Sequence, residues 1–391
     1  MQFLLVLSVA FAFYLLIPGV GGFLARRRWR VFRRRVIAAS RYATAGYPEV
    51  LVGSRSRRSA FIGHYRFFGN LEAIQGEGMV WLTDGKASVA VELADVPVYM
   101  VPGGEVDAAA GRERLSLNAE EGEVPSATTW KKVGSLPEGT RMFVAGELYG
   151  DQGRAVFQGE PLVIMYDGSD DTLLFRSIRD GRQVNEYWNS LTPISIAAGS
   201  LALLILAYLY IGSPLMRIAG ILSASLGLLP VSILAPPGVV LFFVYRRLWR
   251  RGRRYRAERD LLRLPLRYGP QGFRRAILPD GEVYERVELP ASALQGDRSL
   301  LWRFPLVVKF PPERAVVFGI VPSGEGGGSS LPGAPRDPMA ERVALPGDPE
   351  WLSVTSQRRA RVMELSAAAS IGVALVANFY LLVLLVSLLI P

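Results

Sequence analysis

The run Arg26-Arg27-Arg28-Trp29-Arg30-Val31-Phe32-Arg33-Arg34-Arg35 decides how this chain is organised. It follows directly on an apolar segment, Phe3 to Leu24, which at about 1.5 Å per residue is long enough to cross about 30 Å of hydrocarbon. Positive charge that follows a span favours the cytoplasmic side. We therefore expect residues 1–24 to form a transmembrane helix with a cytoplasmic C-terminal flank. A cleaved signal peptide is the alternative, but no basic residue precedes the apolar segment.

Composition excludes several kinds of chemistry. Half of the 391 residues are hydrophobic, which favours several spans together with folded mass outside the membrane. The chain has no cysteine, so disulfides, thiolate catalysis and cysteine-ligated metals are excluded. His64 is the single histidine and cannot form a histidine-rich metal site. The sequence predicts no metal site, no cofactor and no catalytic residue.

The net charge of +10 is concentrated in two places. Residues 26–41 hold eight arginines and no acid, and residues 246–259 hold eight arginines and one acid. Without these runs the remainder carries 29 basic and 34 acidic side chains, a net charge of −5. A nucleic-acid partner would require the opposite sign. The basic runs lie beside apolar segments, so their predicted partners are anionic lipid headgroups.

Three further spans are expected, and all the basic runs agree on one orientation. Residues 194–245 should form a hairpin of spans two and three, broken near Ala235 by Pro236-Pro237, and residues 367–391 should form span four. The predicted domains between them are 25–193 and 246–366, both cytoplasmic, with both termini outside. We therefore expect a multi-pass protein of the bacterial inner membrane. The predicted membrane-flank residues are Arg26, Arg27, Arg28, Arg30, Arg33, Arg34, Arg35, Arg246, Arg247, Arg250 and Arg251.

The first cytoplasmic segment has the pattern of a small β barrel. Strands are expected at 64–75, 79–83, 86–93, 141–148 and 154–157, with tight turns at Asp84-Gly85 and at residues 150–153. Residues 112–125 are polar and are expected to be a loop. Five strands in a three-plus-two grouping favour an OB-like barrel, with a β-sandwich as the alternative. Residues 50–190 carry 14 basic and 20 acidic side chains, which again disfavours nucleic acid.

The second cytoplasmic segment predicts a similar β-rich module. Strands are expected at 273–278, 282–289, 300–310 and 314–321, followed by a Gly-rich loop at 323–338 that lacks the Lys-Ser/Thr of a P-loop. Residues 141–146 resemble 314–319, and residues 154–161 resemble 342–349. Each pair precedes a basic stretch and a span. The predicted fold is therefore an α+β membrane protein with four transmembrane helices and two OB-like modules, related by an internal duplication.

The layout of a β module between two spans, with Val144-Ala145-Gly146 preceding Gly159, resembles the beside-a-membrane domain of GIDE-type membrane proteins. The resemblance covers about residues 50–206, with an echo in 257–385. It implies an OB-like module next to the bilayer. Ubiquitin ligase activity in that family depends on a RING domain with zinc-binding cysteines, and this chain has no cysteine.

Few polar residues suggest a site. His64 begins a predicted strand and is interpreted as structural, and Asp167 to Asp171 lacks the spacing of an EF-hand and is interpreted as a solvated turn. In span four, Ser366, Ser370, Ala374 and Asn378 recur every fourth residue, a spacing typical of close helix contact with an interhelical hydrogen bond. Ser370, Ala374 and Asn378 are thus predicted to pack against spans two and three or against a second copy.

The sequence favours a non-enzymatic membrane scaffold or accessory subunit that presents two cytoplasmic β modules to a protein partner or to another copy. Two alternatives stay open. The Pro-broken third span suggests a transporter or channel component, although no charged residue interrupts the spans. A hydrolase at the membrane interface would require carboxylates that converge in three dimensions.

Overall fold

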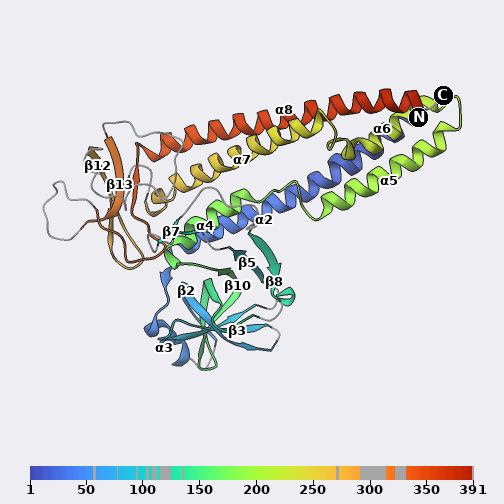
Figure 1. Ribbon diagram of the computed structural model, residues 1–391. Coiled ribbons are helices and arrows are strands. Elements are labelled where there is room, and N and C mark those ends of the chain that lie inside the picture. Colours follow the sequence, from blue (N-terminus) through green and yellow to red (C-terminus); the bar gives the residue numbers. More distant parts are fainter. Residues whose placement is uncertain are drawn as a thin grey trace. The chain divides into compact units, whose positions relative to one another are not determined.

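The computed structural model contains an α+β protein with a β barrel and long apolar helices (Figure 1). It describes residues 1–55, 59–76, 78–93, 96–102, 105–107, 112–114, 125–133, 136–269, 273–290, 314–321 and 332–389. The chain folds as two compact units. The helical unit comprises Met1–Val31, Val184–Tyr255 and Gln357–Pro391, and the β unit comprises Phe32–Gln183 and Arg256–Ser356.

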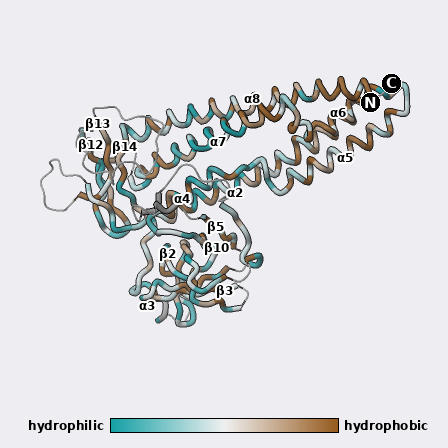
Figure 2. Tube along the Cα trace, in the orientation of Figure 1, coloured by the Kyte–Doolittle hydropathy of each residue, from teal (hydrophilic) through white to brown (hydrophobic). Residues whose placement is uncertain are grey.

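Among the described residues, three helices are long and apolar enough to cross a membrane. The first is Gln2–Ala39, made of α1 (Gln2–Phe11), a π-helical turn η1 (Ala12–Leu16) and α2 (Ile17–Ala39). The others are α5 (Leu191–Ile211) and α8 (Pro349–Leu389). Both termini lie beside the turn after α5, at one end of the helical unit (Figure 1). Figure 2 shows that hydrophobic residues dominate these helices towards that end, whereas the basic parts of α2 and α7 are hydrophilic.

The predicted third span is broken, as expected from its prolines. Helix α6 (Arg217–Ser232) has 16 residues, and α7 (Gly238–Leu262) begins after five residues that include Pro236 and Pro237. Two consecutive prolines lack N–H donors and clash with the preceding turn, so one continuous helix cannot form. Neither α6 nor the apolar start of α7 alone has the length of a span.

The β barrel is closed by five strands: β2 (Ala60–Gln75), β3 (Met79–Thr83), β4 (Ser88–Glu92), β9 (Arg141–Asp151) and β10 (Arg154–Tyr166). Their order is β2–β3–β4–β10–β9, and β9 pairs back to β2. The pair β4–β10 is parallel and the others are antiparallel. Alternate residues point inward and form a core that includes Phe67, Val89 and Phe157, all fully buried. All five predicted strands are confirmed, with longer bounds for β2, β9 and β10.

Both predicted hairpin turns are present. The Asp84 carboxylate accepts hydrogen bonds at 2.8 Å from the backbone N–H groups of Lys86 and Ala87, and Gly85 adopts a φ of +84°. This is the local side-chain turn that makes Asp-Gly a strong hairpin signal. At the second turn Gly153 has a φ of +81°, which costs a glycine little.

Further short elements extend the barrel. Strands β1 (Ala43–Thr44), β5 (Pro97–Val101) and β8 (Ser126–Thr129) add to its sheet, and helices α3 (Tyr47–Arg55), η2 (Trp130–Lys132) and α4 (Asp170–Gln183) complete the module. The prediction of a loop over 112–125 is wrong at its start, because β7 (Arg112–Arg114) pairs with β6 (Glu105–Asp107). Residues 115–124 lie outside the described residues, including the acidic run at 120–123.

The second module is an antiparallel sheet ordered β11 (Arg275–Ile277), β12 (Val283–Pro290), β13 (Arg314–Ile320) and β14 (Val343–Leu345). Its core includes Tyr284 and Phe318, and the 3-10 turn η3 (Pro265–Tyr268) packs beside it. The predicted hairpin across Pro279-Asp280-Gly281 and the strand at 314–321 are confirmed. The strand expected at 300–310, and the Gly-rich loop up to residue 331, lie outside the described residues.

The strand registers can be compared with the alignment on which the predicted repeat rests. Phe143 of β9 lies opposite Ile164, and its counterpart Val316 of β13 lies opposite Leu345. If 141–146 is equated with 314–319, residues 162–164 take the place of β14, whereas the predicted repeat aligned 342–349 with 154–161. Strand β9 pairs with β2, and β13 pairs with β12.

Candidate functional site

The predicted membrane-flank arginines differ in how exposed they are. The exposed ones are Arg27, Arg28, Arg30, Arg34, Arg247, Arg250 and Arg251, while Arg246 is half-buried. Arg33 is buried in the β unit, where it donates to the backbone oxygen of Gly181, and Arg35 donates to the backbone oxygen of Glu160. Arg33 and Arg35 thus hold α2 against protein groups.

Within the helical unit, Glu186 joins two of the basic segments. Its buried carboxylate lies 2.8 Å from the Arg26 Nε and 3.2 Å from an Arg253 Nη. Burial raises the pKa of Glu186, but Arg253 and Arg26 outweigh that effect, and the pKa lies below its ordinary value. Glu186 is therefore charged at neutral pH and fixes the basic parts of α2 and α7 to the segment before α5.

Aromatic side chains surround this ion pair. The guanidinium of Arg253 lies 4.6 Å from the ring centre of Trp249, which also contacts Tyr187 at 5.9 Å and Tyr245 at 6.0 Å. Trp188 is exposed beside them. Aromatic rings and arginines at one level, next to apolar helices, are typical of a membrane–water interface.

In the β unit, Asp260 of α7 forms a second junction. Its carboxylate lies 2.6 Å from the Arg182 Nε of α4 and 4.0 Å from the Arg33 Nε of α2, and it pairs with its neighbour Arg259. Burial raises the pKa of Asp260, but Arg182 and Arg259 lower it more, so the pKa lies below the ordinary 3.8. One carboxylate thus ties three helices together.

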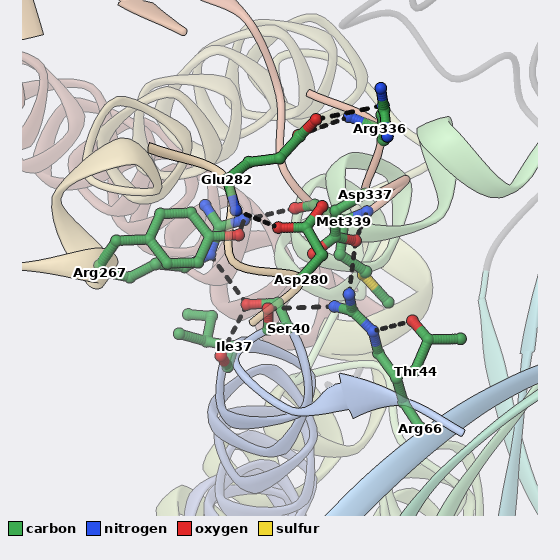
Figure 3. A network of polar contacts seen from close by, with 11 residues as sticks. Ile37, Ser40, Thr44, Arg66, Arg267, Asp280, Glu282, Arg336, Asp337 and Met339 are labelled. Atoms are coloured by element: carbon green, nitrogen blue, oxygen red, sulfur yellow. Dashed lines mark hydrogen bonds and ion pairs between the residues drawn. The ribbon is translucent and has the colours of Figure 1, made fainter. Parts of the chain in front are cut away.

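A network of buried polar groups joins the two β modules (Figure 3). Arg66 of β2 pairs at 2.5 Å with Asp337, both side chains are at most 2% exposed, and Arg66 also donates at 3.1 Å to the Ser40 backbone oxygen. From the second module, the Arg267 Nε donates at 2.8 Å to the Ser40 hydroxyl. Because Phe67 fills the barrel core, Arg66 beside it faces outward. Sequence reasoning missed this pair, since its members belong to different modules.

The predicted helix-packing residues all face other helices of the helical unit. Ser370 donates at 3.1 Å to the backbone oxygen of Leu241 in α7, and Ala374 is fully buried. The Asn378 amide donates at 2.6 Å to the backbone oxygen of Ser232 at the end of α6. A Cβ on Gly238 would lie 2.3 Å from this amide nitrogen, so the start of α7 fits against Asn378 because it is glycine.

Further hydrogen bonds between the described helices were not predicted. Tyr14 of η1 donates at 3.0 Å to the Leu226 backbone oxygen of α6, Ser195 of α5 donates at 2.6 Å to that of Phe13, and Ser223 of α6 donates at 2.7 Å to that of Leu203. Serine and tyrosine are common in spans, and sequence spacing does not show which carbonyl they reach. Such bonds hold neighbouring apolar helices together.

The remaining sequence candidates have structural contacts. His64 is exposed, with its ring 5.5 Å from those of Tyr42 and Phe61. Asp170 accepts a 2.5 Å hydrogen bond from the Tyr166 hydroxyl at the first turn of α4. Within the part of the chain that the structure describes, no three His, Asp or Glu side chains form a group that could hold a metal ion. Comparisons with protein families, curated proteins and solved structures found no match to this chain.

Proposed function

We propose that this chain is a non-enzymatic, multi-pass protein of the bacterial inner membrane that acts as a scaffold or accessory subunit. Four membrane passes, the third formed by α6 and the start of α7, would leave both β modules in the cytoplasm and both termini outside. The observation that carries the proposal is the order of residues along the helices. Apolar residues, aromatic rings and arginines follow one another in the first helix and in α7, and the Glu186 ion pair joins them at one level.

A rigid cytoplasmic platform is supported by the junction of the two modules. Both belong to one compact unit, and the fully buried Arg66–Asp337 pair connects them. Asp260 adds a charged link between α2, α4 and α7 within that unit. A platform of this kind suits a protein that holds partners beside the bilayer, with the exposed arginines bound to anionic headgroups.

We further propose that the barrel is OB-like and that the second module is its duplicate. A five-stranded closed barrel with one parallel pair supports the first point. The neighbour order β12–β13–β14, all antiparallel, matches β2–β9–β10. When residues 141–146 are aligned with 314–319, Ala145 is equivalent to Phe318. Arg66 lies opposite Ala145 and Arg286 lies opposite Phe318, so Arg66 is equivalent to Arg286. This supports descent from one unit and the resemblance to beside-a-membrane domains.

The scaffold proposal is tested by site-specific photo-crosslinking in intact cells. A photoreactive phenylalanine replaces Phe61 on the barrel or Ile277 on the second module, which are 54% and 74% exposed. Tyr208 of α5, 83% exposed on an apolar helix, is the matched control position. We expect at least one of the two β-module positions to crosslink to a specific protein. The control position Tyr208 should not crosslink to that same protein. Absence of a reproducible protein adduct from both modules would contradict the scaffold role.

A further inference from the structure

An apolar groove of about 450 Å³ lies among α1, η1, α5, α6 and α8 of the helical unit. Its size falls within the roughly 300–1,000 Å³ of ligand pockets in proteins. Ten of its eleven described lining residues are aliphatic, phenylalanine or proline, and Tyr14 supplies the one hydroxyl. The lining residues on which the inference depends are Ala10, Tyr14, Leu226, Pro230, Ile233 and Leu375.

The groove results from interruptions in two helices. The π-helical turn Ala12–Leu16 contributes Tyr14, and π turns are frequent at functional sites. In α6, Pro230 has no N–H, so the backbone oxygen of Leu226 loses its usual donor four residues on. Tyr14 donates to that oxygen at 3.0 Å and also shares a 3.0 Å hydrogen bond with the Ser200 hydroxyl. The Tyr14 hydroxyl and the Leu226 carbonyl in the groove wall are therefore already hydrogen-bonded.

This wall determines the chemistry of the occupant. Because the Tyr14 hydroxyl and the Leu226 carbonyl are already paired, the described wall is suited to hydrocarbon. A transmembrane helix from a second copy would be about 10 Å wide and about 30 Å long, far larger than the groove. A polar substrate would lose its hydration without replacement hydrogen bonds.

We propose that the groove holds one acyl chain of a bilayer phospholipid. The proposal rests on the membrane insertion stated under the proposed function, because the bilayer then supplies such chains as solvent. The exposed arginines at the end of the apolar segments would concentrate anionic phospholipids nearby. A chain in the groove would complete the contacts between α1, α6 and α8 that the two interruptions leave open.

The test measures lipids retained by the full-length protein after extensive washing in mild detergent, using native mass spectrometry and lipid extraction. We expect about one phospholipid per chain on the native protein. Ala10, at 8% exposed, lines the groove, so Ala10→Phe should fill it and lower retention at least about tenfold. Ala369→Phe, at an exposed position of α8, is the matched control and should retain the lipid.

Two results would overturn the proposal: no phospholipid on the washed native protein, or undiminished retention by folded Ala10→Phe. A retained isoprenoid or free fatty acid in place of a phospholipid would also overturn it. Because the native protein alone gives the first readout, the test stands even if Ala10→Phe does not fold. Extraction of the native chain by alkaline carbonate would instead refute membrane insertion, and hence the proposed function itself.

Discussion

Pro230 in α6 and Pro236 just after it each remove a helical N–H donor from a backbone oxygen, and a side chain from another helix donates to each of these oxygens. Tyr14 donates to the oxygen of Leu226, four residues before Pro230. Asn378 donates to the oxygen of Ser232, four residues before Pro236, and this oxygen also accepts from the Ala235 N–H at 2.9 Å. An unpaired carbonyl in hydrocarbon is costly, so such donors are needed wherever a membrane helix is interrupted. Asn378 therefore adds a second hydrogen bond at the end of α6 as well as packing there.

Replacement of Asn378 by leucine should destabilise the helical unit. The substitution removes one of the two donors to the Ser232 oxygen and is expected to cost about 0.6–2 kcal/mol, the range for interhelical hydrogen bonds in membranes. The measurement is thermal unfolding in detergent. Ser387→Leu is the control, since Ser387 is exposed on the same helix and donates within it to Leu384. Equal unfolding temperatures and oligomeric states for Asn378→Leu and the native protein would refute the role of Asn378.

The Arg66–Asp337 pair makes a sharper prediction, because both charges are buried. Arg66→Met leaves Asp337 without its ion partner and should destabilise the β unit by about 3–5 kcal/mol, as should Asp337→Leu. The double substitution should recover much of that loss, since two apolar groups need no partner. Denaturant unfolding followed by tryptophan fluorescence measures all three. Additive losses in the double variant would mean that the two side chains are not coupled.

At the scale of elements, charged side chains fix the helices where they leave the apolar segments. Glu186 links the basic parts of α2 and α7 in the helical unit, and Asp260 links α2, α4 and α7 in the β unit. Arginine suits both junctions because its planar fork donates several hydrogen bonds at once. The basic runs therefore contain two kinds of residue: exposed arginines on the surface, and buried arginines that hold the helices in place.

The lowered pKa of the Asp260 carboxyl group predicts how the stability of the β unit depends on pH. Its pKa in the folded protein lies below 3.8, so its ion pairs stabilise the fold above the unfolded pKa, and this contribution is lost as pH falls through the folded pKa. Asp260→Asn should lower the unfolding temperature at pH 7, and its difference from the native protein should shrink as the pH approaches 3. Asp280→Asn, at an exposed turn carboxylate, is the control. A difference that stays constant down to pH 3 would contradict the ion-pair role.

For the whole molecule, the elements of the fold that depend on local sequence can be predicted. The contacts between residues far apart in the sequence cannot. The barrel hairpins follow from alternating residues and Asp-Gly turns, and the break before α7 follows from Pro236-Pro237. Strands β1 and β8 escape prediction because they are too short for a periodic pattern. Of the interhelical donors, Asn378 is recognisable as an amide in an apolar segment, whereas Tyr14 depends on a π turn and a proline in another helix.

Membrane topology is the property of the whole chain that the basic runs should control, and the absence of native cysteine makes it directly measurable. Leu215→Cys lies in the exposed turn after α5, and Lys86→Cys and Ile277→Cys report on the two β modules. In intact spheroplasts, a membrane-impermeant maleimide should label Leu215→Cys alone, and permeabilisation should expose the other two. Replacement of the arginines of residues 26–35 by glutamate should make Lys86→Cys reactive in intact cells, because the charge that holds this flank inside is reversed. Continued protection of Lys86→Cys in that background would show that residues other than this run fix the orientation of the first helix.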